Sequence, residues 1–423
     1  MGVDSYQALD INSLIPKLSR EHTALVEINT TSVGSSFFIL LPNTEFSAKE
    51  SKRNIITLFI NDLTTDSLNK ILWNHDNKEE SWLGIYPMYK KERRSWLKNQ
   101  ELVLKKIGDL VWPKLDSLLQ YHKISKLVFV PNGKLFLFPL HATPFSPIDG
   151  EILTQIYPLQ RYSICYSPSA HVYEQLIQKH SQKTRICNAL FIGDPDDNLG
   201  AHFSNENWFS KKLSKHNIQL KTLRYKDITI KNILENVGQS NLIHYHGHGY
   251  FNWFKPEESG LQMYSPGKPK ILLSVNQIQK DANLSQANLV VLSACETGMT
   301  DILKDAFEDQ YIGLPASFLR SGAKAVIGSL WQVPNTETSL LFSRFYLELF
   351  NEKENFSPAE ALRRAQLWLM RAKPEAVEEA EYKYLGLEEG TKKLNLTHSQ
   401  SPYSHPENWA GFYIVGDGFS KLK

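Results

Sequence analysis

The stretch Leu289-Val290-Val291-Leu292-Ser293-Ala294-Cys295-Glu296-Thr297-Gly298 decides the fold. Four apolar residues are followed by small polar ones and a cysteine, which is typical of a buried strand that ends in a tight turn. A second short run, Asn241-Leu242-Ile243, leads into His244-Tyr245-His246-Gly247-His248-Gly249. In open parallel sheets, reactive side chains collect at the carboxyl ends of strands. The two stretches therefore predict a parallel sheet in which His248 and Cys295 lie side by side.

A cysteine beside a histidine is a combination suited to nucleophilic chemistry. A free thiol has a pKa of about 8.5, so an adjacent imidazole that stabilises the thiolate or takes its proton makes the sulfur a better nucleophile. Gly249 has no Cβ, so a substrate carbonyl can approach its backbone. We expect the amides of Gly249 and Cys295 to form an oxyanion hole, in which each donor contributes about 3 to 4 kcal/mol.

Other interpretations of these residues remain open. Buried cysteines are common as small hydrophobic residues, and Cys165 and Cys187 lack a comparable glycine-bearing turn. His244, His246 and His248 alternate, so on a strand they would share one face and could hold zinc. The stretch lacks the acidic residue usual in zinc hydrolases with His-x-His runs, and no second cluster supplies further ligands. We interpret His244 and His246 as structural, and we expect neither a metal nor a cofactor.

Further motifs are distributed over most of the chain, at residues 131–135, 138–140, 166–170, 191–195, 313–318, 321–323, 328–331, 361–366 and 405–412. With these motifs the chain resembles the CHAT family, caspase-like domains usually found beside tetratricopeptide repeats and related to caspases and separases. A histidine 47 residues before the cysteine also suits the caspase-type arrangement. The resemblance implies a caspase-like, mostly parallel α/β sheet flanked by helices, preceded by a smaller, inactive pseudo-peptidase-like α/β unit.

The resemblance also implies roles for individual residues. His248 and Cys295 would be the catalytic dyad, with the Gly249 and Cys295 amides facing the oxyanion. In relatives, the residue two before the cysteine helps to line the pocket for the side chain preceding the cut. In this chain that residue is Ser293.

The segment after the Trp331 motif would line the same pocket, through Gln332 and Asn335. Relatives often have an aspartate where Asn335 stands, which suits a basic substrate side chain. We therefore expect no simple acidic pocket for arginine or lysine here, unless Glu337 turns inward. Asn335 follows Pro334 and could also cap the next helix.

Composition limits the cellular setting and the partners. The net charge of +2 and the 22% of charged residues suggest neither nucleic acid nor a membrane surface as a partner. Three cysteines provide no disulfide framework, which indicates a reducing compartment. The sequence shows no signal peptide and no apolar run of about 18 residues, so we expect a cytoplasmic protein. It also shows no repeat of about 34 residues, so a sensor or activator would be a separate chain.

Apolar periodicity predicts the order of elements. Strands are expected at residues 24–29, 36–41, 54–60, 127–130, 189–192, 219–223, 242–246, 289–292, 325–327 and 412–415, and helices between most of them. We expect an N-terminal pseudo-caspase-like unit at residues 1–170 and a catalytic CHAT domain at residues 171–423. Residues 250–270 would flank the cleft, and residues 373–404 would form an insertion. Ser357-Pro358-Ala359-Glu360 predicts a capping box.

The predicted function is that of a caspase-like cysteine endopeptidase. Its substrate would be one effector protein in a bacterial regulatory or antiviral pathway, and a partner would activate it. Two alternatives stay open: a catalytically silent scaffold or interaction module with a caspase fold, and a zinc hydrolase.

Overall fold

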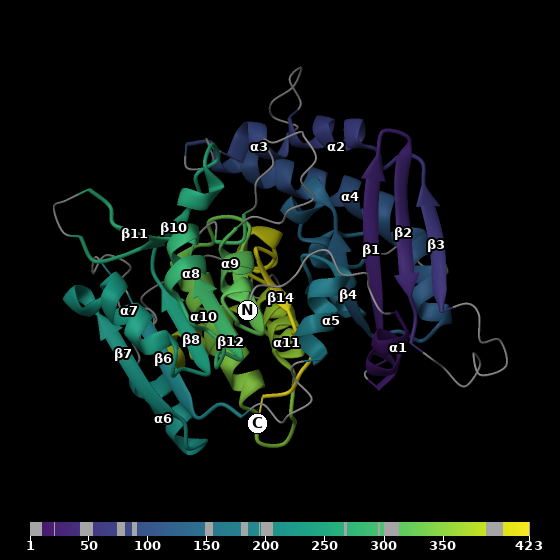
Figure 1. Ribbon diagram of the computed structural model, residues 1–423. Helices are drawn as coiled ribbons and strands as arrows, with labels where there is room; N and C mark the ends of the chain where they lie inside the picture. The colour runs from purple at the N-terminus through teal and green to yellow at the C-terminus, as the bar shows by residue number, and fades with distance from the viewer. Residues whose placement is uncertain are drawn as a thin grey trace. The chain divides into compact units, whose positions relative to one another are not determined.

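The computed structural model describes residues 11–20, 22–42, 54–73, 81–86, 91–148, 155–178, 185–193, 195, 206–265, 269–294, 297–299, 313–385 and 401–422. Cys295 and Glu296, and part of the expected insertion, lie outside these residues. The chain divides into two compact units, residues 6–174 and residues 175–423. Each unit has its own group of strands and its own covering helices (Figure 1).

The strands of the first unit follow the order β3–β2–β1–β4–β5. Their bounds are β1 (Thr23–Thr31), β2 (Gly34–Leu40), β3 (Ile55–Ile60), β4 (Lys126–Pro131) and β5 (Ser163–Tyr166). The pairs β1–β2 and β2–β3 are antiparallel, whereas β1–β4 and β4–β5 are parallel. The helices are α1 (Ile11–Arg20), α2 (Thr65–Leu72), α3 (Trp82–Ile85) and α4 (Arg93–Tyr121). The strands expected from the sequence in this part of the chain are confirmed.

The long helix α4 is fixed by an aromatic and polar network. The Trp112 ring stacks on Phe145 and Tyr162, and its indole N–H lies 3.1 Å from the Leu140 carbonyl. The buried Asp116 carboxylate accepts from the Tyr162 hydroxyl at 2.7 Å and pairs with Arg161. A buried carboxylate is tolerated only with such partners, so this network joins α4 firmly to the start of β5.

The second unit contains the mostly parallel sheet that the sequence predicts. Its order is β14–β13–β12–β8–β6–β7, and β13–β14 is antiparallel while the other neighbours are parallel. The bounds are β6 (Asn188–Gly193), β7 (Gln219–Arg224), β8 (Leu242–His246), β12 (Leu289–Ser293), β13 (Ala325–Ser329) and β14 (Phe412–Gly416). β8, β12, β13 and β14 are buried along their whole length, so helices must cover both faces.

Helices lie on the two faces of this sheet (Figure 1). On the His244 face, rings of α6 (Glu206–Lys215) and α10 (Asn335–Leu349) pack against the imidazole, and α11 (Pro358–Arg371) packs on α10. On the opposite face, side chains of α7 (Ile230–Val237), α8 (Val275–Asp281) and α9 (Leu314–Arg320) line a small apolar cavity with Tyr245. The remaining helices are α5 (Ala170–Gln178) and α12 (Pro374–Ala380).

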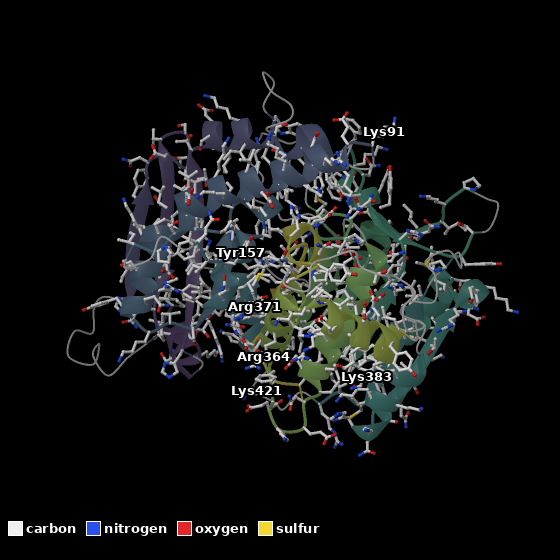
Figure 2. The ribbon with its side chains drawn as sticks, turned by 180° about the vertical axis from the view of Figure 1, so that it is seen from behind. Lys91, Tyr157, Arg364, Arg371, Lys383 and Lys421 are labelled. Atoms are coloured by element: carbon white, nitrogen blue, oxygen red, sulfur yellow. The ribbon has the colours of Figure 1, made fainter. Side chains whose placement is uncertain are left out.

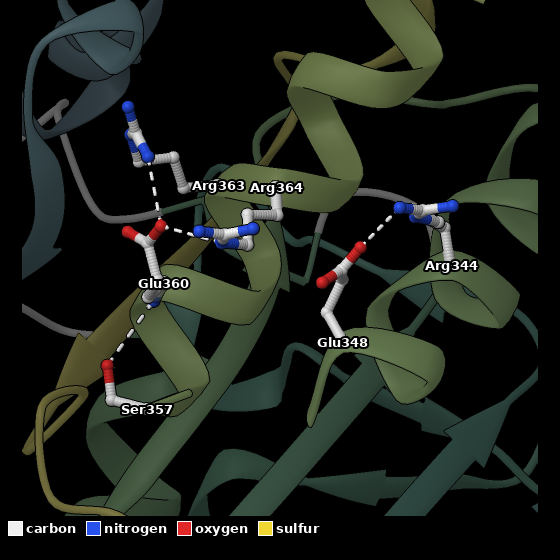
Figure 3. Close-up of polar contacts among 6 residues, drawn as sticks. All are labelled: Arg344, Glu348, Ser357, Glu360, Arg363 and Arg364. Carbon is white, nitrogen blue, oxygen red and sulfur yellow. Dashed lines mark hydrogen bonds and ion pairs between the residues drawn. The ribbon is translucent and has the colours of Figure 1, made fainter. Parts of the chain in front are cut away.

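The predicted start of α11 is only half right. The Ser357 hydroxyl accepts from the Glu360 amide at 3.4 Å, which is the expected N-cap bond. The return bond of a capping box is replaced, because the Glu360 carboxylate accepts from Arg363 and Arg364, each at 2.9 Å (Figure 3). A second ion pair, Arg344 with Glu348, lies on α10 in the same view.

The expected capping role of Asn335 is wrong. Pro334 occupies the N-cap position of α10 and offers no side-chain bond, and Asn335 is the first residue of the helix. Proline pre-sets the backbone at a helix start, which leaves the asparagine side chain outside the capping position.

On the next helix, α11, the side chains of Arg364 and Arg371 are exposed and stand seven positions apart (Figure 2).

A small antiparallel sheet follows β8, in the order β11–β10–β9. Its strands are β9 (Gly249–Tyr250), β10 (Gly260–Gln262) and β11 (Leu272–Ser274), and β10 pairs antiparallel with both of the others. Among the helices of the described residues, none combines the length and the apolar character that crossing a membrane requires.

Candidate active site

The strands β8 and β12 are parallel neighbours, and their register pairs His246 with Ser293. His246 Nδ1 lies 3.2 Å from Ser293 Oγ, and the Gly247 amide donates to the Ser293 carbonyl at 3.4 Å. The carboxyl ends of the two strands therefore meet, as the sequence predicts. His248 stands two positions beyond His246, and Cys295 stands two positions beyond Ser293 in the sequence.

The backbone of His248 is held from two sides. Its carbonyl accepts from the Gln262 amide of β10 at 2.9 Å, and the buried Tyr245 hydroxyl lies 3.0 Å from the same oxygen. The Tyr245 hydroxyl is also 2.8 Å from the Gln262 carbonyl. A Cβ at Gly247 would lie 2.4 Å from the Tyr245 oxygen. Glycine is thus required there because the chain passes directly over the phenol, and His248 itself is half-buried.

The turn that carries Cys295 is fixed on both of its flanks. Before the cysteine, the Ala294 carbonyl accepts from the hydroxyls of Ser329 at 2.7 Å and Thr297 at 3.1 Å. After it, the Gly298 amide donates to the Ser329 carbonyl at 2.7 Å. The Ser329 amide donates to the Thr297 hydroxyl at 3.1 Å. These bonds are buried, so Ser329 at the end of β13 holds Ala294, Thr297 and Gly298 in place.

Gly298 has a steric requirement of its own. A Cβ at this position would lie 2.4 Å from Tyr413 Cε1 and 3.0 Å from the Ser329 carbonyl oxygen. The Tyr413 hydroxyl donates to the Gly298 carbonyl at 2.7 Å. The glycine of the cysteine motif therefore allows β14 to pack against the turn.

Three of the motifs noted in the sequence meet next to this turn. The Trp331 indole N–H donates to the Glu407 carbonyl at 3.0 Å, and the Leu330 amide donates to the Gly411 carbonyl at 2.9 Å. The buried Gln366 amide donates to the carbonyls of Trp409 and Phe412, each at 2.9 Å. The segment that follows Trp331 is thus anchored at its start by residues 405–412, which Gln366 of α11 holds in turn.

The predicted pocket residues occupy two regions. Ser293 is buried at the end of β12, in contact with His246. Gln332, Asn335 and Glu337 lie beyond β13; Asn335 is exposed, and the other two are half-buried. Burial raises the pKa of the Tyr403 phenol, and the charges of Glu337 and Glu381 raise it further. The charge of Glu337 therefore acts on the Tyr403 phenol.

His244 is a structural residue, as expected. It is fully enclosed among aromatic rings, including those of Phe191, Phe342 and Tyr346, and its Nδ1 lies 2.7 Å from the Tyr346 hydroxyl. Burial, and then the neighbouring His246, hold the pKa of His244 well below its ordinary value of 6.5. The imidazole is therefore neutral at physiological pH.

The three histidines do not continue along one strand. β8 ends at His246, and a bend at Gly247 separates it from His248. Within the part of the chain that the structure describes, no group of three His, Cys, Asp or Glu side chains is arranged to hold a metal ion.

Sequence reasoning missed the residues that hold the site in place: Tyr245, Thr297, Ser329 and Tyr413. Tyr245 and Tyr413 occur within apolar strands, where they look like ordinary core residues. Thr297 and Ser329 stood inside quoted motifs but carried no signal of their own. The glycines beside them, Gly247 and Gly298, were the available clue, because glycine after a strand can indicate close approach of another group.

The fold and the strand-end arrangement define a caspase-like α/β protein. A sequence model of the CHAT domain matches residues 101–417. The chain therefore belongs to the CHAT family, which confirms the resemblance noted from its motifs.

Other similarities are more distant. Tetratricopeptide repeat protein 28 of Homo sapiens is 27% identical over 128 residues, and that of Mus musculus is 28% identical over 137 residues. These matches cover 30% and 32% of this chain, but the chain spans only 4% of each relative. The Saccharomyces cerevisiae separase–securin complex matches with a TM-score of 0.57 and 14% identity, over 96% of this chain and 31% of the yeast chain. Identity this low supports the fold alone.

Proposed function

We propose that the protein is a cysteine endopeptidase with His248 and Cys295 as its catalytic dyad. One observation carries the proposal: His246 and Ser293 are register partners on adjacent parallel strands, and each dyad residue comes two positions after one of them. Equal offsets from a register pair favour two side chains that reach the same edge of the sheet. Membership of the CHAT family supports the same assignment.

The proposed reaction uses groups of this chain only. His248 takes the thiol proton of Cys295, and the sulfur attacks the scissile carbonyl carbon. The amides of Gly249 and Cys295 stabilise the resulting oxyanion. His248 then donates its proton to the leaving amine as the C–N bond breaks, and water hydrolyses the thioester to release the acid and restore the thiol.

The bonds around the two proposed catalytic residues fit this chemistry. A nucleophile gains from a fixed position, because effective concentration falls steeply when reacting groups are misplaced by about 1 Å. The Ser329 and Thr297 bonds hold both flanks of Cys295, and the Gln262 and Tyr245 contacts hold the His248 carbonyl. Gly249 begins β9, whose pairing with Leu261 fixes the backbone beside the proposed oxyanion donor.

The setting of this activity is also part of the proposal. The substrate would be a specific effector protein in a bacterial regulatory or antiviral pathway, and a separate protein would activate the enzyme. Residues 250–262 flank His248, so a partner that contacts this segment could act on the site through the Gln262 bond. Full activity of a dilute, demonstrably monomeric preparation would contradict the need for an activator.

The deciding experiment maps new protein N-termini in a bacterial lysate after addition of the purified chain. Wild type should generate new N-termini, and both Cys295→Ala and His248→Ala should generate none. If wild type cleaves nothing even when a partner is supplied by the lysate, the silent-scaffold alternative gains. Turnover that survives in Cys295→Ala, or that is lost on chelation alone, would favour the metal alternative.

Thiol alkylation tests the nucleophile separately from the substrate. Cys165 is buried and Cys187 is exposed, so Cys187 is the relevant competitor for iodoacetamide. We expect Cys295 to react faster than both in the native protein, because a thiolate stabilised by histidine is the reactive form. A Cys187→Ser variant provides the matched background, and mass spectrometry identifies the labelled residue. Slow labelling of Cys295 in that background would contradict the assignment.

A further inference from the structure

The strand β3 forms an outer edge of the first unit. Within the described residues it pairs with β2 alone, so one side of its backbone has no strand partner. Such an edge presents a row of N–H and C=O groups to any strand that can align with it.

The pairing with β2 shows which backbone groups point outward. The Leu41 amide donates to the Asn54 carbonyl at 2.7 Å, so Asn54 directs its backbone groups toward β2. In an antiparallel pair these directions alternate from residue to residue. The backbone groups of Ile56, Leu58 and Ile60 therefore face β2, and those of Ile55, Thr57 and Phe59 face the open edge.

The side chains of the same three outward residues share one exposed face. Ile55 is 46% exposed and Phe59 is 44% exposed, and Phe38 on β2 adds a third apolar side chain at 43%. Phe38 is the register partner of Thr57, so it stands on the same face. Neither β2 nor β3 contains a charged residue. The result is an apolar stripe that runs beside an open backbone edge.

Phe59 is supported on this stripe by Gly34. A Cβ at Gly34 would lie 2.5 Å from Phe59 Cζ, so the aromatic ring lies directly over the glycine. Gly34 has a φ of +149°, a conformation that other residues rarely adopt. The ring is thus held across β2.

The β7 edge of the second unit carries charged side chains, which are a common protection of edge strands. β7 carries Lys221 and Arg224, and charged side chains on an edge strand discourage pairing with another chain. β3 has no charged residue, whereas β7 has two. The apolar character is therefore specific to the β3 edge.

We propose that β3 pairs with β3 of a second copy of this chain, in an antiparallel, two-fold symmetric arrangement centred on Thr57. In this register Ile55 stands opposite the second copy's Phe59, and Thr57 stands opposite its own equivalent. All three pairs join residues whose backbone groups face outward, so each pair forms two hydrogen bonds. The three pairs also place their side chains on one face, with an apolar pair at each end.

A second copy is the occupant that this edge fits best. A two-fold interface needs a surface that is complementary to itself, so that each contact occurs twice. The sequence Ile55-Ile56-Thr57-Leu58-Phe59 meets this condition, because it has apolar residues at equal distances on both sides of Thr57. The pairing closes after two copies, since each copy contributes its one β3 edge and a two-fold contact occupies both.

Sedimentation velocity of the full chain tests the proposal from about 1 to 100 μM, a range that detects weak specific association. Wild type should pass from monomer to dimer as the concentration rises. Thr57→Pro should weaken the dimer by about tenfold or more, because each copy loses one outward N–H donor. The β2–β3 ladder should survive, since the Thr57 N–H does not face β2 and edge strands tolerate proline. Thermal unfolding checks this point.

Two further variants complete the design. Phe59→Lys, which places a charge in each end pair without touching the backbone, should also give a monomer. Thr222→Pro makes the same change on the β7 edge, where the Gln219 bond to Cys187 implies that Thr222 faces outward, and it should dimerise like wild type.

Three outcomes would overturn the proposal. If the wild-type chain stays monomeric throughout the range, β3 does not pair with a second copy. A strand of another protein would then be the alternative partner. A dimer that persists in both Thr57→Pro and Phe59→Lys would show that the copies meet elsewhere. Open-ended assembly would contradict the two-fold register. Peptidase activity enters none of these readouts, so they are independent of the proposed function.

Discussion

His246 and Ser293 face each other across the parallel strands β8 and β12, with the imidazole Nδ1 3.2 Å from the serine oxygen. Both side chains are buried. The contact joins the two strands immediately before the proposed catalytic residues. We therefore expect it to support the site and to take no part in the chemistry.

The two neighbouring histidines should respond differently to mutation. His248→Ala should abolish peptide cleavage, because it removes the proposed proton carrier. His246→Ala should retain turnover, because its imidazole contacts Ser293 on the neighbouring strand. Cleavage is measured on substrates found in the lysate experiment, with circular dichroism to confirm folding. Loss of turnover in a folded His246→Ala protein would show that the proposal assigns the proton transfer to the wrong histidine.

Ser329→Ala should loosen the turn that carries Cys295. The Ala294 carbonyl is buried and accepts from Ser329 at 2.7 Å, so losing this donor should cost about 1 to 2 kcal/mol of stability. We expect a larger relative loss in kcat than in KM, because the change displaces the proposed nucleophile. Ser339→Ala, a buried serine on α10, is the matched control and should leave kcat unchanged. Equal kinetics for the two variants would contradict a positioning role for Ser329.

Tyr245→Phe tests the support of His248. The hydroxyl lies 3.0 Å from the His248 carbonyl and 2.8 Å from the Gln262 carbonyl, and removing it leaves buried carbonyl groups with one partner fewer. We expect a loss of about 1 to 3 kcal/mol in the free energy of unfolding, measured with urea. Hydrogen exchange at the Gln262 amide should become faster. Unchanged stability and exchange would show that the backbone bond alone holds His248.

Buried His244 should make the protein sensitive to acid. Its pKa in the folded state lies well below the ordinary value of 6.5, which the unfolded chain keeps. Above pH 6.5 both states are neutral at this residue, so its stabilising effect is fully present. Below that pH the unfolded state binds a proton that the folded state does not, and stability falls by up to about 1.4 kcal/mol per pH unit.

The measurement compares two variants that both lack the Tyr346 hydroxyl, the partner of His244 at 2.7 Å. Unfolding of Tyr346→Phe is followed as a function of pH and compared with His244→Phe in the same background. The double variant should show a shallower decline below pH 6.5. Parallel curves would place the acid sensitivity on other groups, such as His122 and His216, whose pKa values burial also lowers.

The sequence alone predicted the parts of the fold that depend on apolar periodicity. The apolar residues before His246 and Ser293 formed the expected parallel strands β8 and β12. Helix starts were less predictable, because local alternatives compete for the same groups. Glu360 was expected to bond back to the N-cap, but Arg363 and Arg364 on its own helix offer charged donors that bind a carboxylate more strongly.

The supporting residues of the site could not be found from one sequence because their partners are distant in the chain. The bond from Tyr413 to Gly298 joins residues 115 positions apart, and the Ser329 hydroxyl reaches Ala294 across 35 positions. No local pattern encodes such a pair. The strand β3 itself was predicted, but whether it stands at an edge of the sheet depends on the strand order, which a single sequence does not show.

The proposed specificity pocket gives the last prediction. Asn335 is exposed at the first position of α10, where relatives often have an aspartate, and its amide offers a dipole but no charge. A carboxylate in a partly desolvated site binds a basic side chain more tightly than an amide does, by about 1 to 3 kcal/mol. Asn335→Asp should therefore raise cleavage after arginine by about tenfold or more, measured as kcat/KM on a peptide library.

Glu337 is the competing source of negative charge near Asn335, and its charge raises the pKa of the Tyr403 phenol. We therefore expect wild type to prefer polar or apolar residues before the cut, or to depend on docking outside the pocket. Glu337→Gln should leave this preference unchanged. If wild type cleaves strictly after arginine, if Asn335→Asp has no effect and if Glu337→Gln abolishes cleavage, then Glu337 forms the base of the pocket. In that case the charge that acts on Tyr403 would also have to act on the substrate.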